Sequence, residues 1–191
     1  MEEYTVKKSF GKWHDFVLLF FGFILTSLFG SLITYYVQSR NIDYQNELIQ
    51  LQTERQKAEM VFTEISNIMD KRVYRMRKII WGYRSNDERI NLDNKWRDYE
   101  NVLEEWNLGL NKNLSFIQIY FGKEARMKFE SVIHKKLKKA GYLLQEYKKF
   151  KAKDDFDESI KLIDQVNEDI YKLDIFMLEA ISNNRIGKFH K

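Results

Sequence analysis

Residues Phe16–Val37, FVLLFFGFILTSLFGSLITYYV, contain no charged side chain, and the nearest charges on either side are Asp15 and Arg40. An α-helix rises ~1.5 Å per residue, so this stretch would cover roughly 33 Å as a helix. That length matches a membrane hydrocarbon core of about 30 Å. We therefore expect one transmembrane helix that anchors the protein in the cell membrane as a single-pass protein.

Two other structures produce an apolar stretch of this kind. A cleaved signal peptide has an apolar region of ~7–15 residues, followed by small residues at the cleavage site. Here the run is longer and ends in Tyr35-Tyr36-Val37-Gln38. A buried core helix normally carries a polar stripe, whereas this segment is apolar all round. The sequence favours a permanent anchor over both alternatives.

Small residues follow one line along the expected anchor. Gly22, Thr26 and Gly30 lie at four-residue steps, and Ser27 and Ser31 lie beside them. Such a stripe lets two helix backbones approach closely in lipid, where packing drives helix association. It predicts self-association, although glycine and serine are also common in membrane helices that do not pair.

Composition indicates a helical protein. The chain has 191 residues, no proline, eight glycines and 31% charged residues, which permits long uninterrupted helices. About 150 residues remain outside the anchor, enough for one compact domain. Because cysteine is absent, disulfides, thiolate metal sites and cysteine nucleophiles are excluded.

Beyond the anchor, apolar residues recur at three- and four-residue steps, the spacing of amphipathic helices. We expect a first helix that leaves the membrane and runs to about Arg84, with a break near Ser39–Asn41 left open. Three further helices are expected at about Trp96–Phe121, Lys123–Phe150 and Asp155–Asn184. Gly122 should end the second of these four helices, and Asp154-Asp155 with Glu158 should cap the start of the last.

These expectations define an all-α fold: an N-terminal transmembrane helix that continues into a long stalk helix and an antiparallel four-helix bundle. The expected boundaries are a polar N-terminal tail at 1–15, the transmembrane helix at 16–37, a helical stalk at 38–57 and the bundle domain at 58–191. Leu48 and Leu51 make a weak heptad in the stalk, which suits a coiled coil between subunits. Trp106 lies in the middle of the longest apolar stripe and should be buried.

Orientation in the membrane follows from lysine and arginine near the anchor. Lys7, Lys8 and Lys12 precede it, whereas Arg40 alone follows within the next 15 residues. This bias favours a cytoplasmic N-terminus. The opposite orientation would place the basic domain in the cytoplasm, where nucleic acid becomes a plausible partner.

The formal net charge is +4. A candidate basic surface comprises Lys135, Lys136, Lys138, Lys139, Lys148, Lys149, Arg185, Lys188 and Lys191. Such a surface attracts lipid headgroups or nucleic acid, but an ordinary solvated helix face has the same composition. We favour the solvated face for the lysines of the third helix, and contact with the membrane surface for the C-terminal residues.

Catalytic motifs are few. The chain has no phosphate-binding glycine loop, no His-Glu-x-x-His and no serine elbow, and its histidines at 14, 134 and 190 are scattered. We expect no metal and no cofactor. A group of largely polar residues on the first two bundle helices is dense enough to line an interior network or a subunit interface, without an assigned ligand: Ser66, Asn67, Arg72, Tyr74, Arg75, Trp106, Asn107, Asn111 and Asn113.

The spacing Arg185-Ile-Gly-Lys-Phe-His190 resembles the Arg-x4-His pattern of HEPN ribonucleases, small all-α proteins that cut RNA at a dimer interface. The resemblance covers six residues at the end of the chain. It implies that Arg185 and His190 would bind and activate the scissile phosphate. An Arg and a His in a basic tail also suit headgroup contacts.

The function expected from these features is that of a membrane-anchored, self-associating interaction, sensor or effector module without enzymatic activity. Its expected partners are the lipid bilayer and a second copy of the chain, and a protein partner is left open. The alternative is an RNA-directed accessory protein of a bacterial defence system, similar to HEPN proteins.

Overall fold

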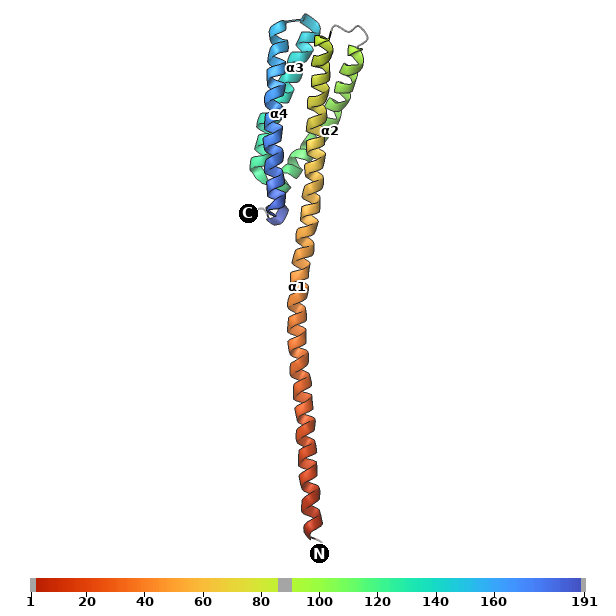
Figure 1. Cartoon of the computed structure of the whole chain (residues 1–191), viewed down its shortest axis with the longest axis vertical. Coiled ribbons are helices and arrows are strands. Elements are labelled where there is room, and N and C mark those ends of the chain that lie inside the picture. The colour runs from red at the N-terminus through yellow and green to blue at the C-terminus, as the bar shows by residue number, and fades with distance from the viewer. Residues whose placement is uncertain (1–2, 86–90, 190–191) are drawn as a thin grey trace. The chain divides into compact units, whose positions relative to one another are not determined.

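The computed structural model describes the backbone of residues 3–85 and 91–189, and the side chains of residues 13–85 and 91–188. This part of the chain is helical and contains no strand, which confirms the all-α prediction. In chain order, the elements are α1 (Glu3–Arg84), α2 (Leu92–Met127), the π-helix η1 (Lys128–His134), α3 (Lys135–Phe150), α4 (Lys153–Ser182) and the 3-10 helix η2 (Gly187–Phe189). Figure 1 labels the four α-helices.

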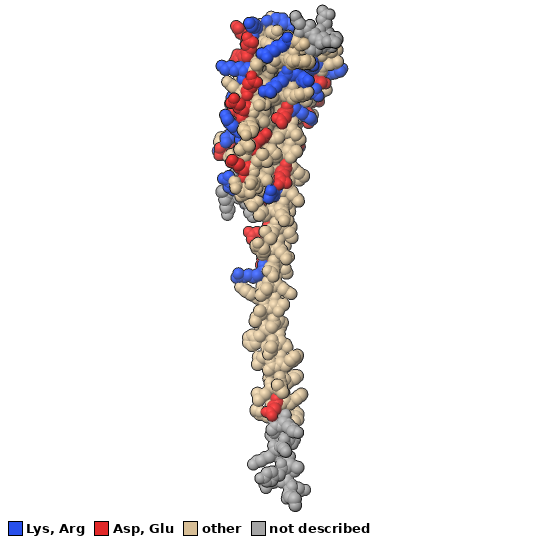
Figure 2. All heavy atoms as spheres, in the orientation of Figure 1, with Lys and Arg blue, Asp and Glu red and all other residues tan. Residues whose placement is uncertain are grey.

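The chain divides into two compact units, residues 1–50 and residues 51–191. The first unit is helical from Glu3 onward and has no break near Ser39–Asn41. Because the intervening residues lack proline and glycine, nothing in the backbone interrupts the helix. None of the apolar window in this helix is buried, and Figure 2 shows that part of the surface without Lys, Arg, Asp or Glu.

The second unit encloses one apolar core to which every long helical segment contributes. Its members with almost no exposed surface include Ile65, Met69, Met76 and Ile79 of α1, Trp106, Ile117 and Phe121 of α2, Phe129 and Ile133 of η1, Leu137 and Leu144 of α3, and Val166, Leu173 and Met177 of α4. Trp106 is 1% exposed, which confirms the predicted burial of this side chain. On the surface of this unit, acidic and basic side chains are interspersed (Figure 2).

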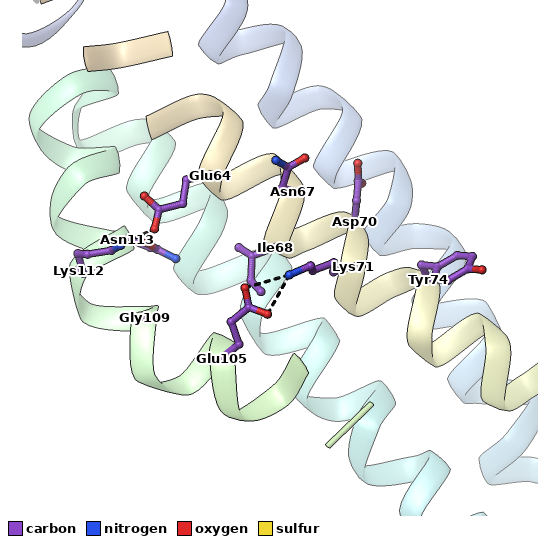
Figure 3. Close-up of a pocket in the computed structure, with 10 residues that line it drawn as sticks. All are labelled: Glu64, Asn67, Ile68, Asp70, Lys71, Tyr74, Glu105, Gly109, Lys112 and Asn113. Atoms are coloured by element: carbon purple, nitrogen blue, oxygen red, sulfur yellow. Dashed lines mark hydrogen bonds and ion pairs between the residues drawn. The ribbon is translucent and has the colours of Figure 1, made fainter. Parts of the chain in front are cut away.

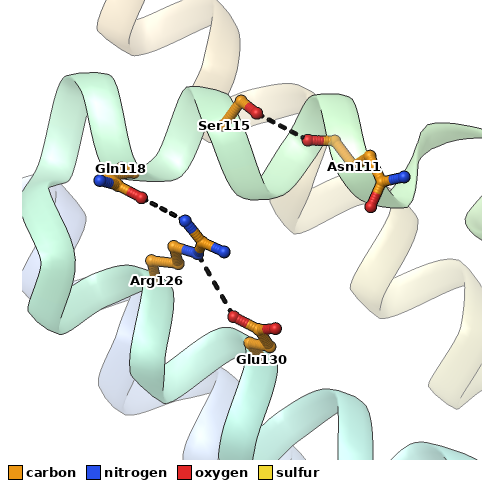
Figure 4. Close-up of polar contacts among 5 residues, drawn as sticks. All are labelled: Asn111, Ser115, Gln118, Arg126 and Glu130. Atoms are coloured by element: carbon orange, nitrogen blue, oxygen red, sulfur yellow. Dashed lines mark hydrogen bonds and ion pairs between the residues drawn. The ribbon is translucent and has the colours of Figure 1, made fainter.

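A sharp turn at Gly122 separates the long first part of α2 from its last few residues, 123–127. Its backbone has φ 83° and ψ 177°, a conformation that residues with a Cβ rarely adopt. The predicted change of helix at Gly122 is therefore confirmed. Arg126 spans the turn: its guanidinium donates to Gln118 on one side and, at 3.3 Å, to Glu130 on the other (Figure 4). Before the turn, the Ser115 hydroxyl donates to the Asn111 carbonyl at 2.9 Å.

The spacing of buried residues explains why η1 is a π-helix. Ala125, Phe129, Ile133 and Leu137 follow one another at four-residue steps, and all four are buried. In an α-helix with 3.6 residues per turn, such steps drift around the axis. The wider π turn cancels the drift and keeps the four side chains on the core side. Val132, in the same stretch, is 36% exposed.

The connection from α3 to α4 differs from the prediction. Lys151 adopts a left-handed conformation with φ 57°, and its N–H donates to the Tyr147 carbonyl at 3.0 Å. This tight turn lets α4 begin at Lys153, with Ala152 as its N-cap. The predicted aspartate cap is therefore wrong. Asp154 and Asp155 lie inside the first turn, where carboxylates stabilise the helix through its dipole.

Candidate functional site

A cation and three aromatic rings meet inside the second unit. Arg72 of α1 is only 2% exposed, and its guanidinium carbon lies 4.8 Å from the ring centroid of Trp106 in α2. Trp106 also stacks on Phe129, with centroids 5.3 Å apart and planes inclined by 14°. The indole N–H of Trp106 donates to Nδ1 of His134 at 3.1 Å. The π-helix carries both Phe129 and His134, so its register aligns them with Trp106.

The bond from Trp106 fixes the chemical form of His134. Since Nδ1 accepts this hydrogen bond, the neutral ring carries its proton on Nε2. Burial lowers the pKa of His134, and the positive charges of Arg72 and Lys138 lower it further against an opposing effect of Glu130. His134 therefore offers one N–H donor, and protonation of Nδ1 would break its bond to Trp106.

Arg72 is a buried cation without an anionic partner. Its Nε and Nη1 have no hydrogen-bond partner, and no carboxylate among the described side chains forms an ion pair with it. Burial lowers the pKa of Arg72, whereas the nearby Tyr99 hydroxyl raises it. A buried charge is costly unless it is paired. Arg72 therefore has no carboxylate partner among the described side chains.

A cavity of about 370 Å³ adjoins this cluster. Its lining comprises Arg72, Tyr99, Leu103, Asn107, Leu110, His134, Lys138, Gly141, Tyr142 and Gln145. Arg72, Tyr99 and Gly141 are buried, whereas Asn107, Lys138, Tyr142 and Gln145 are exposed. The lining thus has a buried floor and a polar rim, and it contains Arg and Lys but no Asp or Glu.

Gly141 gives the floor its shape. A Cβ at this position would collide with the Tyr99 hydroxyl and would approach the Met76 methyl to 3.7 Å. Because position 141 of α3 has no side chain, the Tyr99 hydroxyl can lie beside Arg72.

A second, larger hollow of about 760 Å³ lies between α1 and α2 (Figure 3). It is lined by Glu64, Asn67, Ile68, Asp70, Lys71, Tyr74, Glu105, Gly109, Lys112 and Asn113. Both lysines in it are already paired: Lys71 with Glu105 at 3.0 Å, and Lys112 with Glu64. The hollow contains one buried polar atom without a partner, Oδ1 of Asn113. Its lining has three acidic and two basic side chains, so, unlike the Arg72 cavity, it has no excess of positive charge.

The predicted small-residue face lies in the first unit. A Cβ added at Gly22 or Gly30 would meet no atom within 4 Å, so this face is open. The Thr26 hydroxyl donates to the Gly22 carbonyl at 2.8 Å, and the Ser31 hydroxyl donates to the Ser27 carbonyl at 2.6 Å. These polar groups are therefore satisfied within the helix and place no unpaired donor in an apolar environment.

Several lysines of the predicted basic surface have acidic or aromatic neighbours. Lys136 pairs with Asp169 at 2.6 Å, Lys139 with Glu158 at 2.5 Å and Lys149 with Glu146 at 3.2 Å, and the ammonium of Lys148 lies 4.9 Å from the Trp96 ring centroid. Lys135 and Lys188 are exposed. Lys138 belongs to the cavity lining.

The predicted Arg185 and His190 pair is described only in part. Arg185 is exposed, and its backbone N–H donates to the Ala180 carbonyl at 2.8 Å. His190 and Lys191 lie outside the described residues. The next residue, Ile186, is fully buried. Among the side chains that the structure does describe, no group of three His, Cys, Asp or Glu could hold a metal ion.

The density of polar residues pointed to Arg72 and Asn107, and the basic surface included Lys138, but the sequence analysis did not bring these residues together or single out Tyr99 and His134. Tyr99 and Leu103 resembled ordinary core positions of an amphipathic helix, and His134 was one of three scattered histidines. A charged residue inside an apolar period was the available signal: Arg72 lies three residues after Met69 and four before Met76, both of which are fully buried.

Comparisons with known proteins add no identification. A scan against protein-family models, a search of curated proteins and a search of solved structures each returned no match. The function must therefore be argued from the chain itself.

Proposed function

We propose that this protein is a single-pass membrane-anchored helical-bundle protein that self-associates and acts as a non-enzymatic interaction, sensor or effector module. Residues 16–37 are the anchor, residues 38–57 the stalk and residues 58–191 the bundle. The single observation that carries the proposal is the apolar helix: it is long enough to cross a membrane, and none of its apolar window is buried.

The exposed apolar side chains of this helix would be unfavourable in water. Its large exposed side chains include Phe16, Leu19, Phe23, Leu32 and Ile33, each more than half exposed. Monomeric soluble proteins rarely leave so large a continuous apolar surface in water. A lipid environment removes the cost of this exposure, and the helix satisfies its own backbone hydrogen bonds, as a membrane requires.

Self-association is proposed through the face that contains Gly22 and Gly30. Both positions are open, so the backbone of a second copy can approach there. Leu48 of the stalk is 40% exposed and is available to the proposed coiled coil.

The experiment for the anchor combines membrane extraction with topology mapping. The protein should stay in the membrane fraction under alkaline carbonate, and reporter fusions at the two ends should lie on opposite sides of the membrane. Release by carbonate would refute the anchor.

The experiment for self-association compares Gly22→Leu/Gly30→Leu with a control on the opposite side of the helix, Ile24→Ala/Leu28→Ala. The leucines at 22 and 30 should block close backbone approach and lower the dimer fraction in detergent. The control should not. An unchanged oligomer size in the glycine variant would remove this part of the proposal.

A further inference from the structure

The Arg72 cavity has the composition of an anion site. Two fixed positive charges, Arg72 and Lys138, line it, and no Asp or Glu does. Hydrogen-bond donors come from three helical elements: Arg72 from α1, Asn107 from α2, and Lys138 and Gln145 from α3. Tyr99 and His134 add a hydroxyl and, in the neutral ring, an Nε2–H.

We propose that this cavity binds a phosphate dianion, either inorganic phosphate or the phosphate group of a small soluble molecule. The charge of Arg72 has no counterion within the described chain, and a bound anion would supply one. The proposal goes beyond the membrane role and does not depend on it.

The number of charges favours phosphate over a single carboxylate. Two cationic side chains match a dianion, and charge-assisted hydrogen bonds to phosphate oxygens are about twice as strong as neutral ones. The size also fits, since a volume of about 370 Å³ lies at the lower end of small-molecule sites, which span roughly 300–1,000 Å³.

The rim provides a path to the floor. Lys138, Tyr142 and Gln145 are exposed and lie on the same helix, α3. An anion that enters here meets Lys138 first and reaches Arg72 at the buried floor. The Trp106 ring, with its centroid 4.8 Å from the guanidinium carbon, and the nearby Tyr99 hydroxyl hold Arg72 in place, so the site is already formed before the anion binds.

The test uses the full-length protein in nanodiscs of phosphatidylcholine and titrates inorganic phosphate by calorimetry, with chloride at equal ionic strength as the reference. Phosphate should bind saturably, and at about ten times its Kd it should raise the melting temperature by roughly 3–5 °C. Arg72→Met should weaken binding by at least about tenfold, because it removes a charged donor.

Two further variants keep the result interpretable if Arg72→Met alters folding. Lys138→Met changes an exposed rim residue and should also weaken binding about tenfold. Arg75→Met is the matched control, since Arg75 lies on the same helix but pairs with Asp98 at 2.7 Å and does not line the cavity. It should bind phosphate as the parent protein does.

Three outcomes would overturn the proposal. The first is the absence of phosphate binding by the parent protein beyond the effect of chloride. The second is equal binding by the Arg72, Lys138 and Arg75 variants. The third is binding that appears only when the nanodiscs contain phosphatidic acid, which would assign the anion to a lipid headgroup instead.

Discussion

Trp106→Ala should strongly destabilise residues 51–191. The indole is 1% exposed, and truncating such a side chain in a core typically costs ~3–5 kcal/mol. The variant also removes the ring that lies 4.8 Å from the Arg72 guanidinium, a contact worth up to about 2 kcal/mol when desolvated. The stacking partner Phe129 and the acceptor Nδ1 of His134 lose their contacts as well. The total is about 4–6 kcal/mol.

For a domain of this size, that loss corresponds to a fall in melting temperature of roughly 10–20 °C. The assay is thermal unfolding of the full-length protein in detergent, followed by near-UV circular dichroism, which reports on packed aromatic rings. Trp106→Phe is the control: it keeps an aromatic ring but loses the bond to His134, and it should cost less than half as much. If Trp106→Ala melts within a few degrees of the parent protein, the core described for this unit is wrong.

Two other predictions concern the same cavity. Because burial lowers the pKa of His134, the unfolded chain takes up a proton at a higher pH than the folded protein. The contribution of His134 to stability should therefore be full above about pH 6.5 and should fall as the pH drops below it. His134→Gln should flatten this part of a pH series of melting temperatures, and an unchanged slope would contradict the assignment. Gly141→Ala should displace the Tyr99 hydroxyl, which its Cβ would meet, and lower stability by about 1–3 kcal/mol. The control is Gly109→Ala, where a Cβ meets nothing closer than 3.5 Å. It should raise stability by up to about 1 kcal/mol, because alanine is the better helix former.

The sequence was sufficient for features that depend on local pattern. The uncharged run at 16–37, the apolar periods and the turn at Gly122 each follow from residue spacing alone, and the structure has a helix or a turn at each. It was insufficient where tertiary packing selects among local options. The N-cap of α4 is Ala152 rather than an aspartate, because the left-handed conformation of Lys151 shortens the turn before the helix. Residues 128–134 form a π-helix because buried side chains spaced four residues apart all face the core.

The site was out of reach for a related reason. Arg72 lies on α1, Tyr99 on α2, and His134 and Lys138 on the adjoining η1 and α3, so the first two are far in the chain from each other and from the last two. These residues lie close together only because the helices are aligned in one particular way along their axes. If one helix were shifted by a turn along its axis, the residues would no longer be neighbours. The sequence indicated that Arg72 interrupts an apolar period, but it did not indicate which residues would surround it.

A buried, unpaired arginine is informative because it is costly. Apolar residues of similar volume can replace even paired buried ions with neutral or stabilising effect, so folding alone does not account for Arg72. The Trp106 ring and the Tyr99 hydroxyl nevertheless hold its guanidinium in place. The Tyr99 hydroxyl fits there because Gly141 has no side chain. An arrangement that fixes a cation while leaving two of its nitrogens without partners gives up stability in the free protein. The bound phosphate would restore that stability, so binding and the rigidity of this unit are coupled.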